Sequence, residues 1–314
     1  MYLPKRKTMK NNIVSADSKQ FNRLKVITLI LAILVCFTVI CGFICVYKFY
    51  NKEREMAGSI DSLKQSINEL EVRLDELNPQ LDDEAKTFIS DCNNDNYDLI
   101  FVGNSITRHP LADYWWSNER GMASSTTGKD YVHLTETALS SRMGGTKVNG
   151  YALNFAIWET QINDRSETYP VLDKYFQKGS YLDCVVVQLG ENVNDASGVN
   201  STYRNDYKNL IEHIKEKTPK AQIITVGDFW ADTSKDSIKE EVAKEENVTY
   251  LDLSTIQGDK EYEAGMGTLV DGDDGKKHRI NHLGVANHPG DKGMKWIAKK
   301  DSKSNKITRG SYNK

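Results

Sequence analysis

The chain has 314 residues, of which 39% are hydrophobic and 27% charged, and its formal net charge is −3 at pH 7. This length is typical of one sizeable domain with appended segments, and the nearly balanced charge argues against a nucleic-acid-binding surface. The five cysteines form neither a CxxC pair nor a disulfide framework, which argues against structural zinc. Their spacing leaves open whether Cys92 and Cys184 pair.

The first appended segment is apolar. Residues 26–47 carry no charged side chain over roughly the 20 residues that a helix needs to span a bilayer. The basic excess in residues 1–25 predicts a cytoplasmic N-terminus and a C-terminal body outside the cytoplasm. A cleaved signal peptide is the alternative, but its apolar region normally has only about 7–15 residues. We therefore expect a single-pass signal anchor in the cell membrane, in a bacterial cell.

Residues 48–82 are predicted to form a coiled coil or a spacer helix that ends at Pro79. Apolar residues recur at alternating steps of three and four, at Ile60, Leu63, Ile67, Leu70, Leu74 and Leu77. This spacing, with β-branched residues first, favours a parallel two-stranded coil and hence a homodimer through residues 60–77. A spacer helix packed on the domain explains the pattern equally well.

Residues 83–300 show the alternation of strands and helices that is typical of a three-layer α/β/α domain. The five expected strands are Leu99–Val102, Lys147–Phe155, Asp183–Leu189, Ala221–Val226 and Val248–Leu253. The expected helices are Tyr131–Arg142, Val171–Gln177, Tyr203–Lys217, Ser237–Glu246 and Asp291–Lys300. Right-handed crossovers favour a parallel, flavodoxin-like sheet with strand order 2-1-3-4-5. The tail, residues 301–314, is polar and basic.

Chemically useful residues follow the strands. Ser105 comes directly after the first strand, Asn192 follows the third, and His288 opens the last helix. Ligands of such sheets bind at the carboxyl ends of the strands, beside the point where the strand order reverses. We therefore expect His288 to remove the proton of Ser105, while backbone N–H groups and the Asn192 amide stabilise an oxyanion.

These segments resemble the blocks of the SGNH (GDSL-like) hydrolase superfamily. Ser105 in GNSIT matches the serine block, Asn192 in LGEN the Gly-x-Asn block, and His288 in HPGDKGM the histidine block. The resemblance covers about residues 98–298. It implies a hydrolase of esters, commonly of O-acyl groups on sugars, or an acyltransferase with the same site, and it requires no cofactor.

Two departures from the family pattern affect the site. Ala156 stands where the family usually has a glycine, although its backbone N–H can still serve as an oxyanion donor. Val285 stands where the family usually has the aspartate that orients the histidine. A backbone carbonyl, a carboxylate of the 271–274 loop or Asp291 could take that role, and Asp291 is also a natural helix cap.

Other residues at the same edge are candidates for substrate contact. Trp115, Trp158 and Glu159 fall on loops there, where aromatic rings could stack on sugars, although buried aromatic side chains are commoner. The acidic loop at residues 271–274 does not follow a calcium-loop pattern, so no metal site is predicted.

The sequence thus predicts a membrane-anchored SGNH-type serine esterase outside the cytoplasm, acting on an acylated glycan. An O-acetyltransferase with the same residues remains open. A non-catalytic glycan-binding or surface-assembly protein on a degenerate SGNH fold also remains open, because Val285 replaces the expected aspartate.

Overall fold

The structure is a computed structural model, and its described residues are 31, 34, 37, 41–43, 46–52, 54, 56, 60, 63–64, 80–93, 95–114, 119–161, 163–194 and 201–305. The chain divides into two units, Met1–Leu74 and Asp75–Lys314. All described residues of the first unit are helical. Among the described residues, we find no helix with both the length and the apolar character needed to cross a bilayer. Most of the expected membrane segment 26–47 and of the expected coil 60–77 lies outside them.

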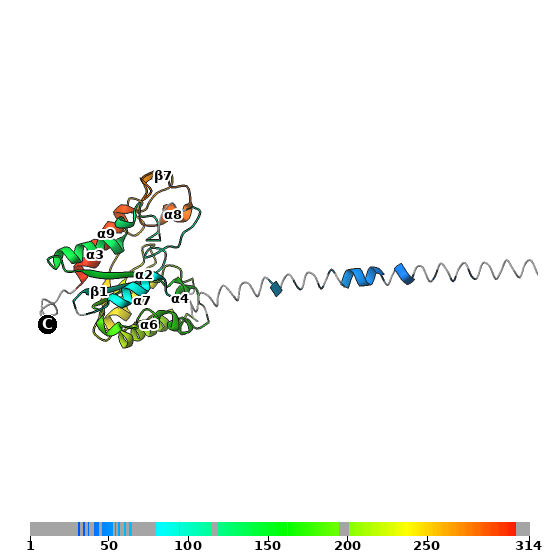
Figure 1. Ribbon diagram of the computed structural model, residues 1–314, viewed down its shortest axis with the longest axis horizontal. Coiled ribbons are helices and arrows are strands. Elements are labelled where there is room, and N and C mark those ends of the chain that lie inside the picture. The colour runs from blue at the N-terminus through cyan, green and yellow to red at the C-terminus, as the bar shows by residue number, and fades with distance from the viewer. Residues whose placement is uncertain are drawn as a thin grey trace, which may run out of the picture. The chain divides into compact units, whose positions relative to one another are not determined.

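The second unit is built on a parallel five-stranded sheet (Figure 1). The strand order is β2-β1-β3-β4-β5, which confirms the predicted topology. The interior strand β1 is buried along its whole length, as its apolar sequence predicts, whereas the edge strand β2 alternates between buried and half-buried residues. The strands are β1 (Tyr97–Gly103), β2 (Val148–Asn154), β3 (Cys184–Gln188), β4 (Gln222–Val226) and β5 (Thr249–Leu251).

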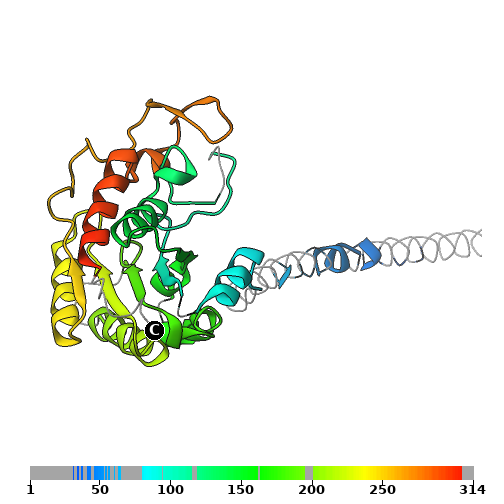
Figure 2. The same ribbon diagram turned by 60° about the vertical axis from the view of Figure 1, so that its left-hand side comes forward.

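Alternate residues of the strands face two separate apolar cores. Ile100 and Val102 pack toward the helices on one face, and Leu99 and Phe101 pack toward those on the other. The first face is covered by α2 (Asp83–Asp91), α4 (Ala156–Thr160), α5 (Tyr169–Asp173), α6 (Tyr203–Lys217) and α7 (Thr233–Glu245). The second is covered by α3 (Tyr131–Arg142) and α9 (Asp291–Ser304), which lie side by side in Figure 2. These faces form the expected three layers.

Side-chain caps fix the starts of several helices. Asp82 accepts from the N–H of Ala85 at the start of α2, and Asp130 accepts from the N–H of His133 at the start of α3. The sequence-based prediction missed α2, although its aspartate cap is a recognisable start signal. The short 3₁₀ turns are η1 (Thr127–Lys129), η2 (Arg165–Thr168) and η3 (Gly179–Tyr181).

A small excursion between β5 and α9 carries the predicted catalytic histidine. It contains a two-stranded antiparallel hairpin, β6 (Leu269–Asp271) with β7 (Lys277–Arg279), and the short helix α8 (Leu283–Asn287). Its own apolar cluster joins Val285 and Ala286 to Met122 and Ala123. This cluster packs the excursion against the loop that follows Ser105 in the chain.

Candidate active site

Ser105 lies on a tight turn at the carboxyl end of β1, an interior strand of the sheet. Asn104 shapes this turn, because its side-chain oxygen accepts from the N–H of Ile106 at 3.0 Å and its carbonyl accepts from the N–H of Arg108 at 3.0 Å. The carbonyl of Ser105 accepts from the N–H of Met122 at 2.8 Å, whereas its own N–H has no acceptor among the described residues. The turn therefore presents a half-buried hydroxyl beside a free backbone donor.

The structure brings Ser105 and His288 together across 183 positions of sequence. The Oγ atom of Ser105 lies 2.8 Å from Nε2 of His288, which is within hydrogen-bond distance. His288 follows α8, and its backbone carbonyl accepts from the N–H of Ala264 at 2.9 Å. The predicted pairing of these two side chains is thus present in the geometry.

The other ring nitrogen of His288 faces a backbone carbonyl. Nδ1 lies 2.6 Å from the oxygen of Gly284, at the first turn of α8. A carbonyl can only accept a hydrogen bond, so Nδ1 carries the proton and the lone pair of Nε2 points at Ser105. Val285 is 1% exposed and belongs to the apolar cluster, so it offers no carboxylate to His288. The site is therefore a serine–histidine dyad oriented by a peptide group.

Asp291 does not orient His288, so this candidate assignment is wrong. Its carboxylate accepts from the N–H of Ser125 at 2.7 Å and from the Ser125 hydroxyl at 2.7 Å, and it pairs with Lys129 at 2.9 Å. It lies in the first turn of α9, where a carboxylate also interacts favourably with the helix dipole. Asp291 thus fixes the loop before α3 to the start of α9.

Burial sets the protonation state of His288. The side chain is 8% exposed, and desolvation lowers its pKa from 6.5 to about 4. The hydrogen bond to Gly284 opposes this shift, and the nearby His109 adds to it. His288 is therefore neutral at physiological pH, which is the form that can accept the proton of Ser105.

The two other predicted oxyanion donors differ in their availability. Asn192 is exposed, and its Nδ2 donates one hydrogen bond to Glu159 at 2.6 Å, which leaves its second N–H free to bind an oxyanion. The N–H of Ala156 donates to the side-chain oxygen of Asn154 at 3.0 Å. Ala156 is thus not an open donor in this structure, because its N–H serves the first turn of α4.

The expected substrate contacts of Trp158 and Glu159 are contradicted by their burial. Trp158 has no exposed surface and packs against Tyr203 and Tyr207, and Glu159 is only 1% exposed. Trp158 packs toward α6, whereas Glu159 accepts hydrogen bonds from Asn104, in the turn after β1, and from Asn192, after β3. Trp115 lies outside the described residues.

Two aromatic features near His288 were missed by the sequence analysis. Trp230, after β4, meets His288 edge to face at 4.9 Å between ring centroids, and its Nε1 donates to the carbonyl of Asn287 at 3.0 Å. Tyr114 and His282 are exposed and stack at 4.0 Å between centroids. Trp230 could have been predicted as a site residue because it follows the end of a strand. The Tyr114–His282 pair could not, because its members lie on loops far apart in the sequence.

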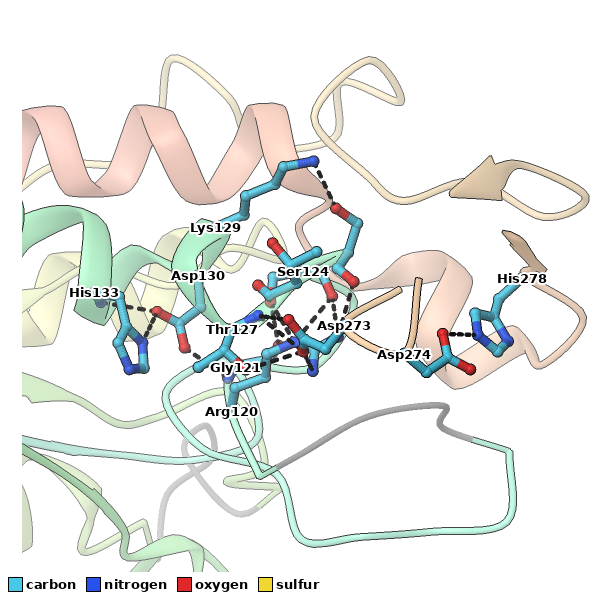
Figure 3. A network of polar contacts seen from close by, with 12 residues as sticks. Arg120, Gly121, Ser124, Thr127, Lys129, Asp130, His133, Asp273, Asp274 and His278 are labelled. Atoms are coloured by element: carbon cyan, nitrogen blue, oxygen red, sulfur yellow. Dashed lines mark hydrogen bonds and ion pairs between the residues drawn. The ribbon is translucent and has the colours of Figure 1, made fainter. Parts of the chain in front are cut away.

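The acidic loop at residues 271–274 anchors the excursion that carries His288 (Figure 3). The guanidinium of Arg120 has no exposed surface and pairs with Asp273 at 2.7 Å, while it also donates to the carbonyl of Ser124. Asp274 lies 2.9 Å from Nε2 of His278. Within the described part of the chain, no three His, Cys, Asp or Glu side chains are grouped to hold a metal ion.

Comparison with known proteins gives only structural similarity. No family model and no curated protein match the chain. Among solved structures, it is similar to a protein of Parabacteroides merdae named as a GDSL-like lipase, with 17% identity, a TM-score of 0.42, and coverage of 68% of this chain and 98% of that one. It is similar to the esterase EstA of Pseudoalteromonas, with 11% identity, a TM-score of 0.42, and coverage of 66% and 94%.

The chain is also similar to phospholipase A1 of Streptomyces albidoflavus, with 13% identity, a TM-score of 0.39, and coverage of 67% and 98%. Because these TM-scores lie below 0.5, any function of this chain has to be argued from the geometry of its site.

Proposed function

We propose that this chain is a serine ester hydrolase of the SGNH type in which Ser105 is the nucleophile and His288 the general base. The observation that carries the proposal is the 2.8 Å approach of Ser105 Oγ to Nε2 of a buried, neutral His288. A serine with a purely structural role in a turn needs no base at this distance. A site that had lost its activity would not require the His288 tautomer that the Gly284 carbonyl fixes.

The reaction follows from these contacts. His288 Nε2 takes the hydroxyl proton while Ser105 Oγ attacks the ester carbonyl, and the resulting oxyanion is held by the Ser105 N–H and Asn192 Nδ2. His288 then gives the proton to the leaving alkoxide, which leaves an acyl group on Ser105. Water, deprotonated by His288, repeats the sequence and releases the acid.

The proposed substrate is an O-acyl group, specifically an O-acetyl group, on a glycan. The predicted location outside the cytoplasm and the resemblance to a family that commonly acts on acylated sugars support this choice. The exposed Tyr114–His282 pair offers a flat ring face on which a sugar could stack, in place of the buried Trp158.

Hydrolysis of 4-nitrophenyl acetate by the full chain in mild detergent tests the proposal. We expect Ser105→Ala and His288→Ala each to lower kcat by about 1,000-fold or more. Ser90→Ala, an exposed serine on α2, serves as a matched control and should leave the rate unchanged. Equal rates for Ser105→Ala and the unmodified chain would refute the assignment.

The substrate class requires a separate measurement. Acetate release from an acetylated polysaccharide, with and without added acceptor sugar, separates hydrolysis from transfer. Diversion of the product from free acetate to an acetylated acceptor would identify an O-acetyltransferase. Saturable glycan binding without either product would favour the binding-protein alternative.

We also propose that residues 26–47 anchor the chain in the cell membrane with the catalytic domain outside. The apolar run and the basic residues before it support this topology. Protease added to intact cells should then remove a tag at the C-terminus, and protection of that tag would overturn the topology. A parallel homodimer through residues 60–77 should give crosslinks between cysteines placed at position 63 of two copies.

A further inference from the structure

A buried carboxylate beneath the site connects the segments that follow three neighbouring strands. Glu159, in α4 after β2, is 1% exposed. It accepts from Asn104 Nδ2 at 3.1 Å, in the turn after β1, and from both the N–H of Gly190 at 2.5 Å and Asn192 Nδ2 at 2.6 Å, after β3. These donors satisfy a carboxylate that has almost no contact with water.

The turn that carries Asn192 is also held through its backbone carbonyls. Lys235, in α7, is 6% exposed and donates from Nζ to the carbonyls of Gly190 at 3.0 Å and Glu191 at 3.2 Å. Gly190 has a φ of +136°, and a Cβ there would lie 2.6 Å from Cε of Lys239. The turn thus has little room to shift between α4 and α7.

We propose that Glu159 is a positioning residue that aims the Asn192 amide at the oxyanion of the reaction; this inference rests on the proposed function. A carboxylate only accepts hydrogen bonds, so it holds Nδ2 of Asn192 inward rather than Oδ1. One N–H of Nδ2 is thereby fixed on Glu159, and the other is left for the substrate oxygen. An exposed amide without this partner would rotate, and its carbonyl oxygen would then repel the oxyanion for part of the time.

The contacts of Glu159 argue against two other roles, binding of substrate and direct action on Ser105 or His288. Glu159 is too deeply buried to touch substrate, and its contacts include neither Ser105 nor His288. Its negative charge by itself would disfavour an oxyanion, so a benefit to catalysis must come through the donors that it orients.

Glu159→Gln is the discriminating variant, because it keeps the shape of the side chain and removes one acceptor oxygen. With 4-nitrophenyl acetate and the full chain in mild detergent, we expect kcat to fall by about 10- to 100-fold while KM changes by less than about twofold. In an Asn192→Ala background, the same change should alter kcat by less than about twofold, because the amide that it orients is absent.

Two further variants complete the design. Asp301→Asn is the control, because Asp301 is also a buried carboxyl side chain, 0% exposed, but lies near the C-terminal end of α9. It should leave kcat unchanged. Glu159→Asp keeps the charge but shortens the reach, so it should retain more activity than Glu159→Gln. If Glu159→Gln does not fold, as judged by its thermal unfolding, Glu159→Asp is compared in the two Asn192 backgrounds instead.

The outcomes separate this proposal from the one on which it rests. If the fold-loss of kcat in the double variant equals the product of the losses in Glu159→Gln and Asn192→Ala, the two residues act independently and the positioning role is overturned. An unchanged or higher kcat in Glu159→Gln would also overturn it. Both results leave a Ser105-dependent esterase intact. If the unmodified chain shows neither Ser105-dependent turnover nor labelling of Ser105 by a fluorophosphonate, the proposed function and this inference both fail.

Discussion

The burial of His288 predicts a pH–rate profile that differs from that of an exposed histidine base. Desolvation lowers its pKa from 6.5 to about 4, with the Gly284 carbonyl opposing the shift and His109 adding to it. Only the neutral imidazole can accept the proton of Ser105. We therefore expect kcat/KM to stay level as the pH falls from about 8 to about 5, and to decline only as the pH passes through the folded pKa.

The expected difference is large enough to measure. At pH 5.5, a base with an ordinary pKa would be about 10% neutral, whereas one with a pKa near 4 would be about 97% neutral, a difference of roughly tenfold in kcat/KM. The gap between the two pKa values corresponds to about 3 kcal/mol. Because the side chain is only 8% exposed, solvent screening reduces this value little.

The assay is release of acetate from a simple acetate ester between pH 3.5 and 8, with the Ser105→Ala rate subtracted at each pH. His133→Gln is a suitable control, because this partly exposed histidine of α3 pairs with Asp130, the cap of that helix, and not with Ser105. Its profile should match that of the unmodified chain. A half-maximal kcat/KM between pH 6 and 7 would refute the inference that burial controls the base.

The same shift has a consequence for stability, with a definite sign. The unfolded chain binds a proton at position 288 below about pH 6.5, whereas the folded chain does so only below about pH 4. Stability from this group is therefore complete at neutral pH and declines by about 3 kcal/mol as the pH falls through that window. Urea unfolding should show a shallower decline for His288→Gln over the same range.

Three further predictions follow from close contacts and burial. Asp228→Asn should lower the free energy of unfolding by about 3–5 kcal/mol, because it leaves the fully buried Lys239 without its ion-pair partner. A loss below about 1 kcal/mol in urea unfolding would contradict this. Gly103→Ala should lower the free energy of unfolding by about 1–3 kcal/mol, because the new Cβ would lie 1.9 Å from Oγ1 of Thr107. It should also lower kcat by disturbing the turn that carries Ser105, and an unchanged kcat would count against this account. Val285→Asp places a carboxylate three residues before His288, and it should destabilise the protein by about 3 kcal/mol without raising kcat, since the site lies in an apolar cluster. A faster enzyme would show that a carboxylate can reach His288 there.

Local patterns were sufficient to predict the sheet. The apolar run Leu99–Val102 ends in Gly103, and four other strand-like runs alternate with helical patterns, so strand identity could be read from neighbouring residues. The handedness of crossovers then limited the strand order, and the observed β2-β1-β3-β4-β5 sheet agrees. Helix α3 and helix α6 have the predicted bounds, and the start of α3 is marked by its Asp130 cap.

The same reasoning could not decide the direction in which side chains point after a strand ends. Trp158 and Glu159 follow β2 at the expected edge, but a turn of helix rotates them inward, where α6 and the Gly190 turn provide their partners. Periodicity gives no orientation for a helix as short as α4, because one and a half turns carry too few apolar positions to define a face.

The sequence by itself determined which atoms could react, since Ser105, Asn192 and His288 follow elements whose order is set by local apolar runs and crossover rules. Only the tertiary structure decided how His288 is oriented and how its proton is held. The partner of Nδ1 is a backbone carbonyl, and every residue has one, so no residue type marks it in the sequence. Its selection depends on the packing of α8 against the loop after Ser105, which also removes water from the imidazole and fixes its neutral state.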